Sequence, residues 1–362
     1  MTLDDLRRFA VGRSLFPPVS LGSAVERLGF VQADPIRAPA RAQDLTLRHR
    51  VKGYRAGDLD RRYPALGIEE DVFVNYGFVS KPVYLLMHPR VNGSRWFRSR
   101  RTRADEVLAF IRERGEVHPR EVDDHFAHGR VTNYWGGSSS ATTHLLEHMH
   151  YRGLLRVTRR EKGIRIYAAR PDLPAPAREM TRAERVDALV DVAVRKYAPL
   201  TTKGLLFLIS RLRYGVPQWQ RALPAAKARA KARLAHARIQ GVDWYWPADE
   251  RPEAAAPDDR VRLLAPFDPV VWDRWRFEAL WGWAYRFEAY TPVAKRKMGY
   301  YALPMLWKDR VIGWGNLSVA DGVLNADFGY VASAPRSRAF RAGLEDELGR
   351  MRAFLGIEGS RQ

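Results

Sequence analysis

"SSSATTHLLEHMHYRGLLRVTRREKGIRIYAAR", residues 138–170, decides the fold. Its first half has apolar residues at helical spacing behind three serines, which are suitable N-caps. Its second half has two short strand-forming runs around Glu161-Lys162-Gly163, which predicts a hairpin with a basic tip. Two more helices are expected just before it, at 103–115 and 118–126. Three helices followed by a two-stranded wing form a winged helix, an elaboration of the helix-turn-helix, and the third helix is its recognition candidate.

The chain on both sides of this unit suggests related units. A Pro-rich linker at 170–180 precedes a segment with the same order of elements, which includes a Lys- and Arg-rich helix at 223–241 and one strand at 242–249. We interpret that segment as a further winged helix with a degenerate wing. On the N-terminal side, two helices lead into the run "FVQADPI" at 30–36, whose alternation predicts a short strand closed by Pro35.

The residue pattern of the sequence changes after a second linker at 249–259. Five short aromatic and β-branched runs separated by turn residues predict a small barrel or sandwich, and the segment 337–357 has the spacing of a helix that packs across it. The expected fold class is therefore α+β and multidomain, with tandem winged-helix (helix-turn-helix) motifs before a small C-terminal β-barrel. The expected domains are a first winged helix at 1–100, a second at 101–172, a third at 181–250, and the barrel with its closing helix at 258–362.

Composition narrows the partners and the chemistry. The formal net charge is +20 over 362 residues, a surplus that attracts polyanions, so nucleic acid is the leading partner; Arg-rich codon usage in a GC-rich genome is the alternative cause. The absence of cysteine excludes disulfides, thiolate catalysis and cysteine-ligated metals. No run approaches the ~20 apolar residues of a membrane span, so we expect a soluble cytoplasmic protein that associates with the nucleoid and not with membranes.

The run "FVQADPI" also contains the candidate catalytic pair, Gln32 and Asp34. Side chains two positions apart point to the same face of a strand, so these two would form one polar face while Ala33 points into the core. The alternative is structural: an aspartate before proline can start a turn, and a Gln-x-Asp triplet alone is a weak signal.

A longer stretch resembles a known family. "LLAPFDPVVWDRWRFEALWGWAYRFEAYTPVAKRKMGYYALPML", residues 263–306, is similar to the C-terminal barrel signature of the YcaQ/AlkZ-type (AlkX) winged-helix DNA glycosylases, and "FVQADPI" resembles their catalytic motif in its YcaQ-like, Gln-x-Asp form. One block departs from the family: where YcaQ-like members read "EYWAHE", this chain reads "VFVNYGF", with Tyr76 and Gly77 in place of the His and the Glu.

The resemblance implies a monofunctional DNA glycosylase of DNA repair. Such an enzyme hydrolyses the bond between deoxyribose and a cationic alkylated base, chiefly N7-alkylguanine and possibly interstrand crosslinks, and leaves an abasic site. The resemblance further implies no metal and no cofactor, three tandem winged helices, and double-stranded DNA with alkylation damage as the partner. We expect the protein to act as a monomer.

The chemistry of the pair fits this activity. N7-alkylguanine departs as a neutral base, so the barrier lies in forming an oxocarbenium-like sugar. A carboxylate, Asp34, can stabilise that cation and draw the proton from attacking water, while the Gln32 amide holds the water in line. The motif has no lysine for a Schiff base, since Lys52 is the nearest, which favours hydrolysis over strand cleavage.

Basic side chains close to the motif, on the wing and on a barrel turn are the candidate DNA contacts, although solvated surface charge explains any one of them equally well. The serines could bind the DNA backbone as in other winged helices. The predicted contacts are Arg37, Arg41, Arg48, Arg50, Lys52, Ser138, Ser139, Arg160, Lys162, Lys295, Arg296 and Lys297.

Other assignments remain open. His144, His148 and His150 could suggest zinc, but only the first two share a helix face and no metalloprotease motif accompanies them, so we assign them to packing or DNA proximity. A non-enzymatic winged-helix transcriptional regulator is the first alternative function, and it would dimerise on a palindrome. A DNA-binding protein with a decayed active site is the second.

Overall fold

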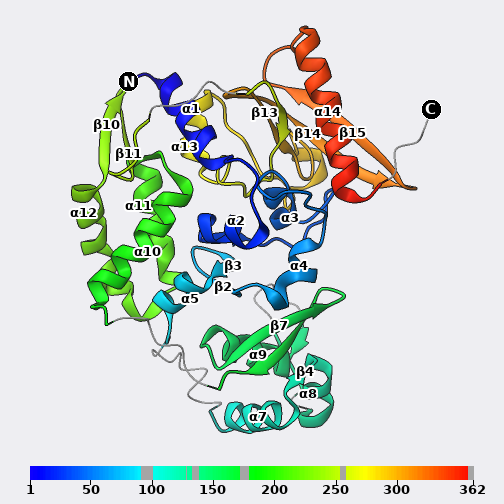
Figure 1. Ribbon diagram of the computed structural model, residues 1–362. Coiled ribbons are helices and arrows are strands. Elements are labelled where there is room, and N and C mark those ends of the chain that lie inside the picture. The colour runs from blue at the N-terminus through cyan, green and yellow to red at the C-terminus, as the bar shows by residue number, and fades with distance from the viewer. Residues whose placement is uncertain (91–100, 128, 133–137, 172–178, 253–257, 358–362) are drawn as a thin grey trace.

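The structure, a computed structural model, describes the chain except for residues 91–100, 128, 133–137, 172–178, 253–257 and 358–362 (Figure 1). It is a mixed α/β fold in which the N-terminal part, blue to cyan, lies between the other segments of the chain. The expected boundaries between the units lie at or next to the ranges 91–100, 172–178 and 253–257, which the structure does not describe.

The N-terminal part begins with two helices as predicted. Thr2 and Asp5 form a reciprocal capping box at the start of the first helix, and the second starts at the N-cap Ser20 and ends at Gly29, where φ is 66°. A three-stranded antiparallel sheet follows, in the order β1-β3-β2. The elements are α1 (Leu3–Ser14), α2 (Leu21–Leu28), β1 (Phe30–Gln32), α3 (Ala42–Leu47), α4 (Asp58–Arg62), β2 (Ile68–Val72), β3 (Tyr76–Ser80) and α5 (Lys81–Met87).

The next unit contains three helices and a hairpin, in the predicted order. Ser140 caps the third helix by accepting hydrogen bonds from the backbone of Thr142 and Thr143. The hairpin turns at Lys162 and Gly163, whose φ angles are 47° and 88°. The elements are α7 (Arg101–Arg114), β4 (Glu116–Val117), α8 (Pro119–Phe126), β5 (Arg130–Thr132), β6 (Ser138–Ser140), α9 (Ala141–Tyr151), β7 (Leu155–Glu161) and β8 (Ile164–Ala169), with sheet order β4-β8-β7.

A related order recurs after residue 181, with one correction. The basic helix α12 ends at Arg233, and Ala235–Ile239 is a strand that pairs with Val242–Trp246, so the wing is a complete hairpin. The predicted helix is too long because Ala235 to Arg238 alternate alanine with a polar residue. Such a pattern is compatible with the period of a helix and with that of a strand. The elements are α10 (Arg182–Tyr197), β9 (Leu200–Thr201), α11 (Thr202–Arg211), the 3-10 turns η2 (Leu212–Tyr214) and η3 (Pro217–Ala222), α12 (Leu223–Arg233), β10 (Ala235–Ile239) and β11 (Val242–Trp246).

The C-terminal part is a curled four-stranded antiparallel half-barrel in the order β12-β13-β14-β15. Four of the five predicted strands are present, but the run 285–292 forms no strand. Its Tyr285 packs on Phe277 of the preceding helix α13, and its Phe287 packs on Phe267 and Tyr301. The predicted closing helix is present and starts at the N-cap Ser337. The elements are β12 (Val261–Leu263), α13 (Arg274–Trp281), β13 (Leu303–Trp307), β14 (Arg310–Ala320), β15 (Val323–Tyr330) and α14 (Arg338–Leu355).

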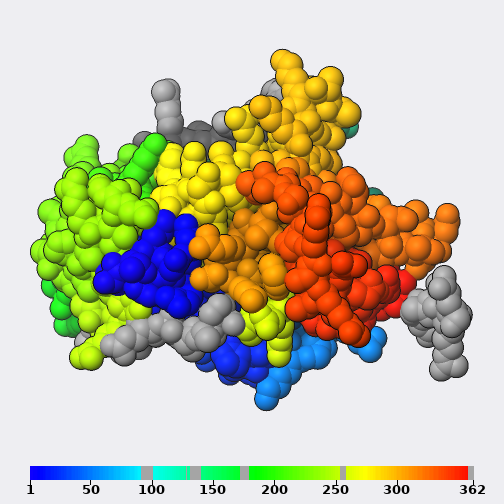
Figure 2. Space-filling model, turned by 90° about the horizontal axis from the view of Figure 1, so that it is seen from above, coloured from blue at the N-terminus to red at the C-terminus, as the bar shows by residue number. Residues whose placement is uncertain are grey.

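The N-terminal part shares its core with every other segment. One cluster of buried apolar residues joins it to 101–169 and to the half-barrel, and a second joins it to 186–246. Figure 2 shows α1, in blue, between the yellow-green region of β10 and β11 and the orange half-barrel. Arg13 of α1 binds Glu250 with a nitrogen to oxygen distance of 2.8 Å. In the described part of the chain, no helix is long and apolar enough to cross a membrane.

Candidate active site

Gln32 is the last residue of β1, an edge strand of the N-terminal sheet. It pairs with Gly77 of β3, and a Cβ at Gly77 would lie 2.2 Å from the carbonyl oxygen of Val31 and 2.9 Å from Cα of Gln32. Only glycine therefore permits this close approach of the two strands. Gly77, which stands where the family block has a glutamate, is therefore needed in this chain for the packing of β1 on β3.

Asp34 lies beyond the strand, because β1 ends at Gln32, so the strand alternation used to predict a shared face does not extend to it. All three residues of β1 are buried, and Asp34 starts a turn in which its Oδ1 accepts the backbone N–H of Ile36 at 2.9 Å. Its own backbone N–H donates to Oε1 of Gln43 at 3.1 Å. A side-chain bond to the backbone two residues on engages one carboxylate oxygen and leaves the other for a further partner.

Both side chains are nearly buried, with 6% of Gln32 and 9% of Asp34 exposed. Burial raises the pKa of the Asp34 carboxyl above its ordinary value, and the Ile36 N–H opposes that shift. Within the described ranges no hydrogen bond engages its Oδ2. The carboxyl group is thus partly desolvated and held through one oxygen, while its other oxygen can receive a proton.

Trp272, from the half-barrel segment, orients Gln32. Its indole Nε1–H donates to Oε1 of Gln32 at 2.9 Å, and the ring of Tyr197 stacks on it at 4.6 Å between centroids. One lone pair of the amide oxygen is thereby occupied, and the amide NH₂ remains to donate. Sequence reasoning had missed this contact, although both segments belong to the parts that resemble the glycosylase family.

The ion pair of Arg50 with Asp268 holds the turn that carries Trp272. Both side chains are fully buried and form two bonds of 2.8 and 3.0 Å, while the backbone N–H of Trp272 donates to the Asp268 carbonyl at 2.8 Å. The predicted phosphate contact of Arg50 is therefore wrong, since a side chain without exposed surface cannot reach DNA. Its charge serves to join two segments that lie 218 positions apart.

Three other predicted contacts are occupied by carboxylates. Arg41 binds Asp60 at 2.6 Å, Arg160 binds Glu70 at 2.6 Å, and Arg48, with 4% of its side chain exposed, binds Glu347. Each of these charges is paired with a carboxylate of the protein, which argues against phosphate contacts by Arg41, Arg48 and Arg160.

The remaining predicted contacts are placed as follows. Arg37 and Lys52 are exposed, and so are Lys162 at the hairpin tip and Lys295 and Lys297 on the turn after Pro292. Arg296 is half-buried and donates to the carbonyl of Thr291 at 2.8 Å. Ser138 and Ser139 belong to β6 and not to the start of α9, and their side chains lie outside the described residues.

An open cavity of about 680 Å³ lies next to the motif, between the loop that follows Asp34 and the hairpin of β14 and β15. Arg37, Tyr300, Tyr301 and Asn316 are among its lining residues. Burial, and after it the charge of Asp34, raises the pKa of Tyr301, so this phenol remains a hydrogen-bond donor at every physiological pH. Asp34 itself does not line the cavity, and Tyr301 and the loop that begins three residues after Asp34 connect the cavity to the motif.

Lys196 is a buried amine near the motif that sequence reasoning also missed. It comes from α10, is 3% exposed, and donates to the backbone carbonyl of Phe30, two residues before Gln32. Burial, and after it the charge of Arg50, lowers its pKa to about 7. No motif signalled this position, because the contact joins parts of the chain 166 residues apart.

The histidines do not form a metal site. His150 is buried, which lowers its pKa to about 4, and its ring packs against Tyr167. Across the residues that the structure describes, no cluster of three His, Cys, Asp or Glu side chains could hold a metal. His144 and His148 line a second cavity of about 270 Å³ together with Tyr76 and Arg165.

The fold and the site together define a class of protein. It is a basic, mixed α/β protein with a desolvated carboxylate and an oriented amide near an open cavity. The chain belongs to the AlkZ-like DNA glycosylase family, whose model matches residues 25–354. Among solved structures it is similar to Streptomyces sahachiroi DNA glycosylase AlkZ, with a TM-score of 0.64 and 14% sequence identity over 99% of this chain and 97% of that chain. That likeness shows the shared fold, and the family match supports a DNA glycosylase of DNA repair.

Proposed function

We propose that this protein hydrolyses the N-glycosidic bond of cationic alkylated bases, chiefly N7-alkylguanine, in double-stranded DNA. The observation that carries the proposal is the Asp34 carboxylate, which is desolvated, held through one oxygen, and adjacent to an amide whose orientation Trp272 fixes. Crosslinks between strands are the bulkier substrates of the same chemistry. The open cavity near Asp34 supports a site that accommodates an adduct.

The two side chains divide the reaction between them. As the base departs with the bonding electrons, positive charge develops on the sugar, and the Asp34 carboxylate stabilises it. A water molecule that accepts a hydrogen bond from the Gln32 NH₂ and donates one to Asp34 is placed to attack the anomeric carbon. Its proton passes to the carboxylate, and the product is an abasic site.

The winged-helix architecture is part of the same proposal. We infer that the units around α7–β8 and α10–β11 are winged helices, since each has a helix, a short strand, two further helices and a closing hairpin along the chain. They would hold the duplex on either side of the N-terminal part, with the protein acting as a monomer at the nucleoid. The expected domain boundaries remain predictions.

The test is the product formed from duplex DNA that carries N7-methylguanine. We expect release of the free base and an intact strand that breaks only after alkali, which is the signature of a monofunctional hydrolase. A covalent adduct trapped by borohydride would show amine chemistry, with Lys196 as its candidate, and would contradict that part of the proposal. Absence of base release together with dimeric binding to one preferred palindrome would support the regulator instead.

A further inference from the structure

A stripe of alternating cations and aromatic rings follows α11 and η2. Lys203, Phe207 and Arg211 are spaced four residues apart and so lie on one face of α11, and the stripe continues through Arg213 and Tyr214. Trp275 of α13 adds a further ring beside Phe207, with their centroids 5.1 Å apart. We call these six residues the α11 stripe.

The rings of the stripe are unusually exposed for their size. The exposed fractions are 39% for Phe207, 39% for Tyr214 and 37% for Trp275. The cations lie over these rings: Lys203 is 4.2 Å from the Trp275 centroid, and Arg211 and Arg213 are 4.5 and 4.8 Å from that of Tyr214. The stripe thus presents flat apolar faces framed by positive charge.

The charge of the stripe is not neutralised internally. Within the described ranges, Lys203, Arg211 and Arg213 form no ion pair with a carboxylate. The basic helix α12 differs, since its Arg229 and Arg233 bind Asp187 and Asp191. A negatively charged partner can therefore bind the cations of α11 more readily than Arg229 and Arg233 of α12, which already form ion pairs.

The stripe is continuous with the candidate active site. The ring of Phe207 is 6.1 Å from that of Trp272, which holds Gln32. At its other end, Nε of Arg211 donates at 3.0 Å to the carbonyl of Val74, in the turn between β2 and β3. A strand bound along α11 would therefore run directly past the end of β1.

We propose that the α11 stripe binds the DNA strand beside the target nucleotide, with phosphates at the cations and unstacked bases on the rings. Cations that follow the backbone and rings on which bases stack are the two elements of single-strand recognition. Intact stacked DNA would offer only its phosphates, so the exposed rings favour a strand opened at the lesion. The inference rests on the proposed function for the place of the stripe in the reaction, whereas binding itself can be measured without base release.

The first measurement is the affinity for a lesion-free duplex with a short unpaired stretch. Fluorescence anisotropy measures this affinity over a range of salt concentrations. We expect Lys203→Gln with Arg213→Gln to reduce the slope of log K against log salt by about 1.4 to 1.8, the contribution of two phosphate contacts. The matched control is Arg338→Gln with Arg341→Gln on the exposed face of α14, which removes the same charge elsewhere.

The second measurement tests the rings. We expect Tyr214→Ala and Trp275→Ala each to weaken binding to the unpaired stretch by about 5- to 100-fold, with a smaller effect on continuous duplex. Arg213→Lys keeps the charge and should retain affinity, which separates a lost contact from misfolding.

The outcomes separate the two proposals. Stripe variants whose binding stays within about two-fold of the α14 control would overturn the inference, even if the wild type releases bases. A wild type that binds through the stripe but releases no base from N7-methylguanine DNA would contradict the proposed function alone.

Discussion

At the scale of single residues, the bond from Trp272 to Gln32 decides how the amide can act. Because Oε1 already accepts the indole N–H, the amide is left to donate through its NH₂. A water between Gln32 and Asp34 must then accept from the amide and donate to the carboxylate. With these two hydrogen bonds, a second lone pair of the water points away from both groups. That lone pair can attack the anomeric carbon of the sugar.

Replacement of Trp272 by phenylalanine should slow base release while DNA affinity stays the same. The change removes the indole donor but keeps a ring for the stack on Tyr197, so the single-turnover rate should fall about 2- to 12-fold, the value of one hydrogen bond. In a Gln32→Ala background the same change should have no further effect. Additive losses in that double variant would show that Trp272 acts independently of Gln32.

The raised pKa of Asp34 predicts an acidic limb in the rate. Ionised carboxylate is the reactive form, and burial favours the neutral form, so the rate should rise with pH through a pKa above the ordinary aspartate value of 3.8 and then level off. Single-turnover base release measured against pH tests this. A rate that levels off below pH 3.8 would mean that the reacting carboxyl is not desolvated.

At the scale of elements, the turn that carries Trp272 depends on Arg50 and Asp268. Arg50 also donates to the carbonyls of Ser14 and Thr46, so one guanidinium joins the end of α1, α3 and the C-terminal segment. Arg50 thus connects the part of the chain that carries Gln32 and Asp34 to the stretch 263–306, which contains Asp268 and resembles the glycosylase family. This buried ion pair therefore supports the candidate catalytic motif structurally.

Arg50→Met should lower the free energy of unfolding by about 3 to 5 kcal/mol, because it leaves the Asp268 carboxylate buried without a partner. The matched double variant, Arg50→Met with Asp268→Leu, removes both charges and should recover much of that loss. Urea denaturation measures both. A double variant that is less stable than Arg50→Met would refute the assignment of the loss to an unpaired charge.

Local signals predicted most elements, and long-range contacts account for what they missed. The structure contains the predicted serine cap, at Ser140, and the predicted hairpin turn, at Lys162 and Gly163, because caps and turns act within a few residues. The predicted strand at 30–36 is shorter than expected, because it ends at Gln32 and the Asp34 side chain bonds to its own turn. Lys196, Trp272 and the buried state of Arg50 each depend on partners over 160 residues away, which periodicity does not report.

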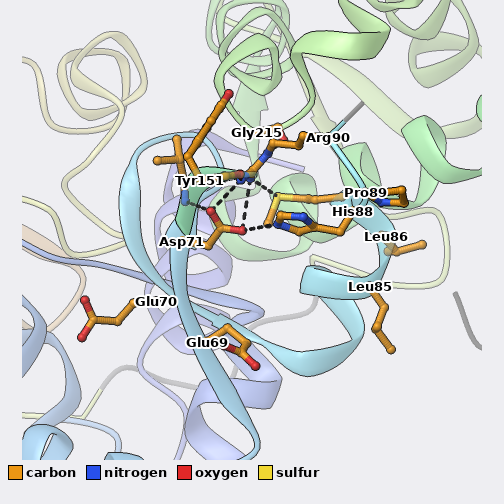
Figure 3. A network of polar contacts seen from close by, with 12 residues as sticks. Glu69, Glu70, Asp71, Leu85, Leu86, His88, Pro89, Arg90, Tyr151 and Gly215 are labelled. Carbon is orange, nitrogen blue, oxygen red and sulfur yellow. Dashed lines mark hydrogen bonds and ion pairs between the residues drawn. The ribbon is translucent and has the colours of Figure 1, made fainter. Parts of the chain in front are cut away.

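At the scale of the whole molecule, carboxylates of β2 fasten the unit 101–169 to the N-terminal part. Glu69 binds Arg170 at 2.6 Å, and Glu70 binds Arg160 at 2.6 Å. Asp71 binds His88 and Arg90 at 2.8 Å (Figure 3). Arg90 also donates to the backbone of Tyr151 and Gly215, so it joins three parts of the chain. The relative position of the units, and so the path of the DNA, depends on these charges.

Glu70→Gln should therefore weaken this attachment at neutral pH. Burial alone would raise the pKa of Glu70, but the bond and charge of Arg160 hold it below its ordinary value. Its contribution to stability is then full above about pH 4.3 and is lost as pH falls through the lower folded-state pKa. We expect the variant to lose about 1 to 3 kcal/mol at pH 7 in urea denaturation, with the difference from wild type shrinking in acid. A difference independent of pH would contradict the ion pair as its cause.

The central claim is that Asp34 performs the hydrolysis, and the comparison of wild type with Asp34→Asn tests it most directly. Asparagine can still accept the Ile36 N–H and avoids the cost of a buried charge, so the variant should fold with an unchanged or higher melting temperature at pH 7. The account predicts that single-turnover release of N7-methylguanine from duplex DNA falls at least about 100-fold while DNA affinity is retained. Base release at the wild-type rate by Asp34→Asn would contradict it.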